Sequence, residues 1–146
     1  MTAKEYLLQY REARAKVDRC RERVEQITES IGSISISYDG MPHGKTVESK
    51  VEREAIRLAE AKRRLEEVVI DAELVRQQIA DDIEMVDGYT YKDLLYARYI
   101  KTMSWVEVTD YVSRYRGERY DEKHVRGYMH AEALRKFAEA VLSKSQ

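Results

Sequence analysis

The sequence has few of the residues that make turns or cross-links. Its 146 residues include one cysteine, one proline and six glycines. The single cysteine, Cys20, excludes an intrachain disulfide and suits a reducing compartment. A β-sandwich needs a turn signal about every 8–12 residues, and this chain does not supply them. The composition therefore favours long helices.

Long apolar runs and a secretion signal are also missing. Runs such as Val68–Ile70 reach only a few residues, whereas a transmembrane helix needs about 20. Residues 1–6 lack the basic start and the apolar block of a signal peptide. We therefore expect a cytoplasmic protein that has no membrane partner.

The sequence contains no familiar catalytic or cofactor motif. No P-loop, GxSxG or GxGxxG pattern occurs in it. His43, His124 and His130 lack the close ligand pairs of a zinc site, and Cys20 belongs to an apolar helix seam. We expect neither an enzyme nor a bound metal or cofactor.

Charged residues, in contrast, are abundant at 36% of the chain, and their balance changes along it. Residues 1–88 hold 15 Lys and Arg against 19 Asp and Glu, whereas residues 89–146 hold 11 against 8. A mildly basic C-terminal part on an acidic body is a weak indication of a polyanionic partner.

Apolar residues at alternating spacings of four and three predict two long helices, over residues 3–30 and 48–86. Thr2 and Glu5 predict a capping box at the start of the first helix. Glycines, serines and the one proline in residues 32–47 predict a loop between them. At about 1.5 Å per residue, the first helix spans about 40 Å and the second about 58 Å. In an antiparallel hairpin, the end of the second helix must then pack on the C-terminal part or on another copy of the chain.

The composition changes after residue 88. Eight of the eleven tyrosines, the only Trp and the only Phe lie between Tyr89 and Phe137. We therefore place a domain boundary at 87–90, which gives a helical hairpin over 1–88, as a possible oligomerisation module, and a small domain over 89–146. Short helices in such a domain need aromatic side chains to fill their core. The core side chains expected here are those of Tyr99, Trp105, Val108, Val125, Met129 and Leu134.

Three helices are expected in the second domain. They cover 91–101, 105–112 and 121 to about 142, with Ser104 and Asp121 at the N-cap positions of the last two. Two short helices followed by a helix with Lys, His and Arg near its start have the layout of a helix-turn-helix. A helix fits the major groove of DNA, and its first turns reach the base edges. The predicted fold is all-α: a long antiparallel hairpin followed by a three-helix helix-turn-helix domain.

A stretch of this domain resembles a known family. Residues 94–108, LLYARYIKTMSWVEV, resemble the LLYLRYIEGKSWEEIA stretch of phage-encoded regulators of the ArpU type, which carry a domain similar to region 4 of bacterial sigma factors. Residues 133–137, ALRKF, resemble the ALRKL that closes region 4, and His130 matches a histidine that often precedes it. The strong resemblance covers residues 91–137. It implies a phage or prophage late-gene regulator, with RNA polymerase as a further partner by analogy.

The chain departs from the family pattern between the two helices of the motif, where residues 113–120 exceed the usual turn of about four residues. This leaves two registers for the third helix. An alignment without a gap turns Arg126 inward and exposes Lys123, His124, Gly127 and Tyr128. A register shifted by one residue turns Val125 inward and exposes Glu122, Lys123, Arg126 and Gly127. An inward guanidinium is costly without a partner, which favours the shifted register for Arg126.

The chemistry of these side chains suggests their roles on double-stranded DNA. Arg126, or less readily Lys123, is suited to donate to guanine O6 and N7. His124 and Tyr128 are suited to a base edge or a phosphate. Residues 113–120 form the connector between the second and third helices, and their arginines would reach the phosphate backbone of the DNA. The predicted DNA-binding residues are Arg114, Arg116, Arg119, Lys123, His124, Arg126, Gly127 and Tyr128.

Other interpretations remain open. The connector arginines also fit a solvated loop, and the charged faces of the two long helices fit a solvated coiled coil. A structural or adaptor protein would use the coiled coil to bind a partner helix. A small-terminase-like DNA packaging subunit would also carry a helix-turn-helix. We expect homo-oligomers through the hairpin, because helix-turn-helix proteins commonly dimerise to read two half-sites.

Overall fold

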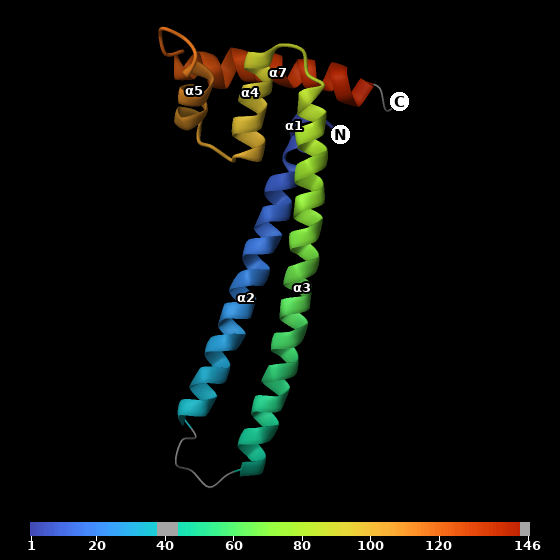
Figure 1. The fold of residues 1–146 in the computed structure, drawn as a ribbon, viewed down its shortest axis with the longest axis vertical. Helices are drawn as coiled ribbons and strands as arrows, with labels where there is room; N and C mark the ends of the chain where they lie inside the picture. Colours follow the sequence, from blue (N-terminus) through green and yellow to red (C-terminus); the bar gives the residue numbers. More distant parts are fainter. Residues whose placement is uncertain (38–43, 144–146) are drawn as a thin grey trace. The chain divides into compact units, whose positions relative to one another are not determined.

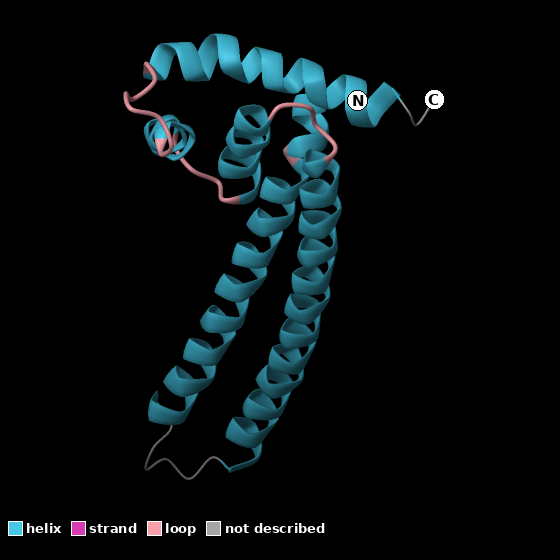
Figure 2. Cartoon of the chain, turned by 45° about the horizontal axis from the view of Figure 1, so that its top comes forward, coloured by secondary structure: helices cyan, strands magenta, loops and turns pink. Residues whose placement is uncertain are grey.

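The computed structural model describes residues 1–37 and 44–143, and the side chains of 35–37 and 44–47 are not described. Every regular element in the described residues is helical, with no strand among them (Figure 2). The predicted all-α fold, with two long helices followed by smaller ones, is confirmed.

The chain divides into two compact units. Unit 1 comprises Met1–Glu12 and Glu73–Gln146, and unit 2 comprises Ala13–Ala72. The divisions fall inside the two long helices, so the ends of these helices belong to the core of unit 1. The compact units thus differ from the predicted domains 1–88 and 89–146.

Unit 2 is a pair of antiparallel helices, formed by parts of α2 (Gln9–Ser37) and α3 (Gly44–Glu84) (Figure 1). Val17, Val68 and Ala72 are buried between them. They belong to the seams that the spacing of apolar residues predicts. The remaining seam positions that pack around this cluster are Ala13, Cys20 and Leu65.

The predicted loop over 32–47 is wrong at its ends. Residues 32–37 continue α2, and α3 begins at Gly44. Ile27, Ile31 and Ile34 keep the spacing of four and three, so the seam runs past Gly32 despite the glycine and serines. The rest of the predicted loop, 38–43, lies outside the described residues.

Unit 1 begins with α1 (Ala3–Leu7), which has the predicted capping box between Thr2 and Glu5. The single predicted helix over 3–30 is divided at Leu8 into α1 and α2. Tyr6 donates its hydroxyl to the buried Asp82 carboxylate at 2.5 Å. Burial, together with the hydrogen bond and the negative charge of Asp82, raises the pKa of Tyr6 to about 12.

The C-terminal end of α3 is buried within unit 1. Ile79, Ile83 and Val86 are 1%, 1% and 2% exposed and pack in the core with the aromatic helices that follow. The sequence left two partners open for these apolar side chains, the C-terminal part or another copy. In the structure they pack on the C-terminal part of the same chain. The apolar stripe that the sequence leaves uncovered at this end is thus covered within the same chain.

Three helical segments complete unit 1. The first is α4 (Tyr89–Leu95), which continues as the π-helical turn η1 (Tyr96–Ile100). The second is α5 (Trp105–Ser113), with a capping box between Ser104 and Glu107. The third runs from 122 to 142 through α6 (Glu122–His124), η2 (Val125–Met129), α7 (His130–Phe137) and η3 (Ala138–Leu142). Asp121 occupies its N-cap, but its side chain makes no capping hydrogen bond.

The core of this part is formed by side chains at helical spacing. Val125, Met129, Ala133 and Phe137 recur every fourth residue along the third segment and are buried. Of the six expected core residues, Tyr99, Val108, Val125 and Met129 are buried. Trp105 and Leu134 are half-buried and pack against the same core.

Candidate nucleic-acid interface

The third helical segment has a single register in the structure. Val125 is fully buried, and the Arg126 side chain is 53% exposed. The register with Val125 inward is therefore correct, and the gapless register, which turned Arg126 inward, is wrong. The residues on both sides of Val125 face solvent. Exposed together with Arg126 are Lys123, His124, Gly127 and Tyr128.

The exposed face of the first turns combines positive charge with rings. His124 and Tyr128 stack with their ring centroids 5.3 Å apart, and Tyr128 is 63% exposed. Arg126 forms a long ion pair of 3.9 Å with Glu122, one helical turn earlier. A Cβ at Gly127 would meet no atom within 4 Å, so the space over the helix is open there.

The connector holds its three arginines at the surface by local contacts. The Arg114 guanidinium lies 3.8 Å from the centroid of the Tyr111 ring and pairs with Asp93 at 3.3 Å. Arg116 donates to the Tyr120 hydroxyl at 2.6 Å. These contacts order guanidinium groups that remain exposed to a partner.

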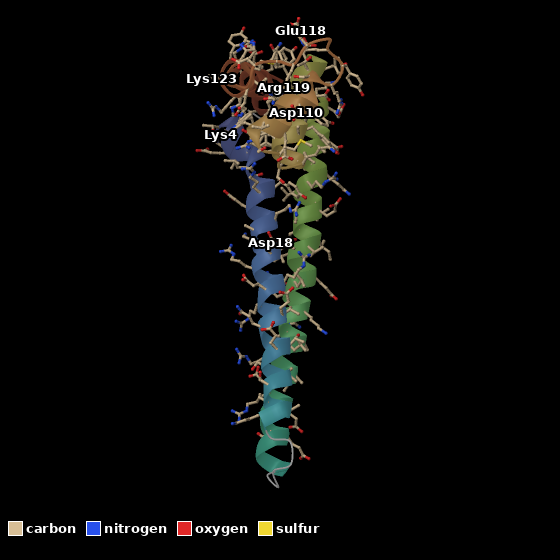
Figure 3. The ribbon with its side chains drawn as sticks, turned by 90° about the vertical axis from the view of Figure 1, so that its left-hand side faces the viewer. Lys4, Asp18, Asp110, Glu118, Arg119 and Lys123 are labelled. Atoms are coloured by element: carbon tan, nitrogen blue, oxygen red, sulfur yellow. The ribbon has the colours of Figure 1, made fainter. Side chains whose placement is uncertain are left out.

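Acidic residues share this surface. Arg119 donates from Nε to Asp110 Oδ1 at 2.7 Å, and Figure 3 shows the region that carries Asp110, Glu118, Arg119 and Lys123. The pairing keeps the Arg119 fork in a fixed position and also offsets part of its charge. The surface is thus of mixed charge, and the three arginines of the connector are each held in place on it by a local contact.

A cationic pocket of about 440 Å³ lies beside this helix, within unit 1. Sequence reasoning did not anticipate it. Six of the side chains that line it are Lys4, Arg11, Arg98, Trp105, Arg126 and His130. The signal available in the sequence was the seven-residue spacing of Lys4 and Arg11, together with an arginine between the core residues Ala97 and Tyr99.

Arg98 is fixed in this pocket from two sides. Its Cζ lies 4.5 Å from the centroid of the Trp105 ring, and Nη1 donates to the Met103 carbonyl at 2.8 Å. Arg11 Nη2 donates to the Arg98 carbonyl at 3.5 Å. Burial and the neighbouring charge of Arg11 lower the pKa of Arg98.

His130 closes the inner side of the pocket. Its Nε2 lies 2.7 Å from the Tyr99 hydroxyl, and its ring meets Trp105 edge-on at 4.7 Å between centroids. Burial, with the charges of Lys4 and Arg98, lowers the pKa of His130 to about 4. The imidazole is therefore neutral at pH 7.

The comparisons with known proteins give no assignment, because no family model, curated protein or solved structure matches this chain. Among the described residues, no group of three or more His, Cys, Asp or Glu is arranged to hold a metal ion. None of the described helices combines the length and apolarity that a membrane crossing requires.

Proposed function

We propose that this chain is a sequence-specific DNA-binding transcriptional regulator. The observation that supports this best is the exposure of Lys123, His124, Arg126 and Tyr128 on the first turns of a helix that follows α5. Side chains at the start of the second helix of a helix-turn-helix contact base edges in the major groove. Arg126 would read guanine, and His124 with Tyr128 would contact a base edge or a phosphate.

The connector would supply the sequence-independent part of the binding. Arg114, Arg116 and Arg119 are exposed, so their guanidinium groups are accessible to phosphate oxygens. Such contacts make affinity fall as salt rises, because bound counterions leave the DNA. The resemblance to phage ArpU-type regulators adds the role in late-gene transcription in the bacterial cytoplasm, and RNA polymerase as a second partner.

Selection of bound duplexes from a random DNA pool tests the proposal, with affinity then measured on the enriched site. We expect Arg119→Ala with Arg126→Ala to weaken binding by tenfold to a few hundredfold, since one base contact contributes about 1–3 kcal/mol. Arg135→Ala is the matched control, because Arg135 pairs with Glu132 and Glu139 on the same helical segment. Binding to this site should also weaken steeply with salt.

Two results would contradict the proposal. Absence of duplex binding at low salt would favour an adaptor that uses its coiled coil. The exposed side chains of Ile70 and Leu74, 61% and 60% exposed on α3, are the observation that favours this second candidate. Binding without an enriched site, by a ring of many copies, would favour a DNA packaging subunit instead.

We further propose that the regulator self-associates, as proteins that read two half-sites commonly do. With Ile79 and Ile83 buried in the monomer, the exposed apolar side chains earlier on this helix are those of Ile56, Val69, Ile70 and Leu74, and we propose that the pair Ile70 and Leu74 contacts a second copy. The two side chains are four residues apart and so lie on one face of α3.

A further inference from the structure

The cationic pocket is lined by four positively charged side chains. Lys4, Arg11, Arg98 and Arg126 line it, and no Asp or Glu is among its lining residues. In the described part of the chain, Arg126 alone of these four forms an ion pair with a carboxylate, at 3.9 Å from Glu122. Like charges that converge in this way disfavour one another unless an anion offsets them.

The side chains around the pocket are already in place. Arg98 is held by Trp105 and by the Met103 carbonyl, and Arg11 is directed to the Arg98 carbonyl. A ligand would therefore find the guanidinium groups of Arg98 and Arg11 ordered, which lowers the entropy cost of binding. The volume of about 440 Å³ lies within the range of small-molecule sites.

The donors select the chemistry of the anion. A guanidinium is a planar fork that matches the oxygens of a phosphate, and an ammonium acts as a compact charge beside it. A set of three arginines and one lysine suits the several oxygens of a phosphate, whether a doubly charged monoester or a singly charged diester, better than a single carboxylate. We propose that this pocket binds a phosphate group, carried either by a small phosphorylated compound or by a DNA strand.

His130 supports the same assignment from the inner wall. The neutral ring contacts Tyr99 and Trp105 and faces the charges of Lys4 and Arg98. An anion among these groups would offset the two cations and raise the pKa of His130. Phosphate binding should therefore be accompanied by proton uptake at mildly acidic pH.

The test is an NMR titration of the full chain with inorganic phosphate at pH 7, and with chloride at equal ionic strength. We expect a saturable shift of the Trp105 indole signal and of the His130 ring signals with phosphate and not with chloride. Lys4→Gln with Arg11→Gln should weaken binding by at least about tenfold, because two charge-assisted contacts are lost. Lys62→Gln with Arg63→Gln on α3 removes the same charge outside the pocket and should leave binding unchanged.

Duplex DNA provides the second arm, which rests on the proposed function, whereas the phosphate arm does not. If the Lys4 and Arg11 substitutions also weaken duplex binding tenfold, the phosphate belongs to a DNA strand. If duplex binding is unchanged, or absent altogether, while inorganic phosphate still saturates the pocket, the ligand is a free phosphorylated compound.

Three outcomes would overturn the phosphate site: no saturable shift with either phosphate or duplex, an equal shift with chloride, or unchanged affinities in the Lys4 and Arg11 variant. Thermal unfolding by circular dichroism establishes that this variant is folded. Lys4→Gln alone, at an exposed position, is the fallback and should weaken phosphate binding severalfold.

Discussion

At the scale of single residues, partners decide what a side chain can do. Trp105 has a ring at helical spacing, and the sequence predicts it simply as a core residue. In the structure the ring is half-buried, with Arg98 on its face and His130 at its edge. Periodicity predicts that a residue faces inward, but it cannot predict that residues 4, 11 and 98 line the same pocket as this ring. Such contacts depend on packing between distant segments.

His130 makes the stability of unit 1 depend on pH. Its pKa is about 4 in the folded chain and near 6.5 when unfolded, so between these values the unfolded chain binds the extra proton. The contribution to stability is complete above pH 6.5 and is lost as the pH falls towards 4. The shift corresponds to roughly 3 kcal/mol, which solvent screening of a half-buried ring reduces to about 1–2 kcal/mol.

We therefore expect His130→Gln to flatten the fall in the free energy of unfolding between pH 6.5 and 4. Glutamine can keep a hydrogen bond to Tyr99 and does not titrate. Urea unfolding at several pH values measures the effect, and His124→Gln at an exposed position is the control. An equal fall in the His130 and His124 variants would show that His130 does not cause it.

At the scale of elements, local sequence patterns predict some helix caps and seams correctly but not every helix end. The seams of the long helices and the caps at Thr2 and Ser104 are local, and the structure confirms them. The end of α2 was not predictable from its glycine and serines, because the isoleucine seam continues through them to Ile34. For the third segment, the cost of burying a guanidinium pointed to the correct register, with Val125 inward.

The capping box of α5 should be important for the stability of unit 1. Glu107 N donates to Ser104 Oγ at 3.3 Å, and the Glu107 carboxylate accepts from Ser104 N at 3.4 Å. Ser104→Ala removes the first of these bonds and should lower the free energy of unfolding by about 1 kcal/mol. Chemical denaturation measures it.

Ser30→Ala is the control for this change, because Ser30 is exposed inside α2, where alanine is the better helix former. A loss of stability as large in Ser30→Ala as in Ser104→Ala would contradict the role of the cap.

At the scale of the whole molecule, the ends of the two long helices belong to unit 1. The sequence indicated that the end of α3 had to pack on something, but length arithmetic could not choose between the C-terminal part and a second copy. Ile79, Ile83 and Val86 pack within the same chain, which removes the apolar surface first expected to hold an oligomer together. The proposed self-association would therefore use side chains exposed earlier along α3.

This gives a direct test of self-association. If Ile70 and Leu74 form the contact, the intact chain should have a solution mass of at least twice its 17.2 kDa, and Ile70→Glu with Leu74→Glu should reduce it to the mass of one chain. Charged side chains at both positions would be buried without partners in such an interface, and this is costly. Size-exclusion chromatography with light scattering measures the mass. Gln26→Glu with Ser30→Glu adds the same negative charge at exposed positions on α2 and should leave it unchanged. A wild-type chain of monomer mass would contradict self-association, and a double glutamate variant that stays oligomeric would assign the contact to another surface.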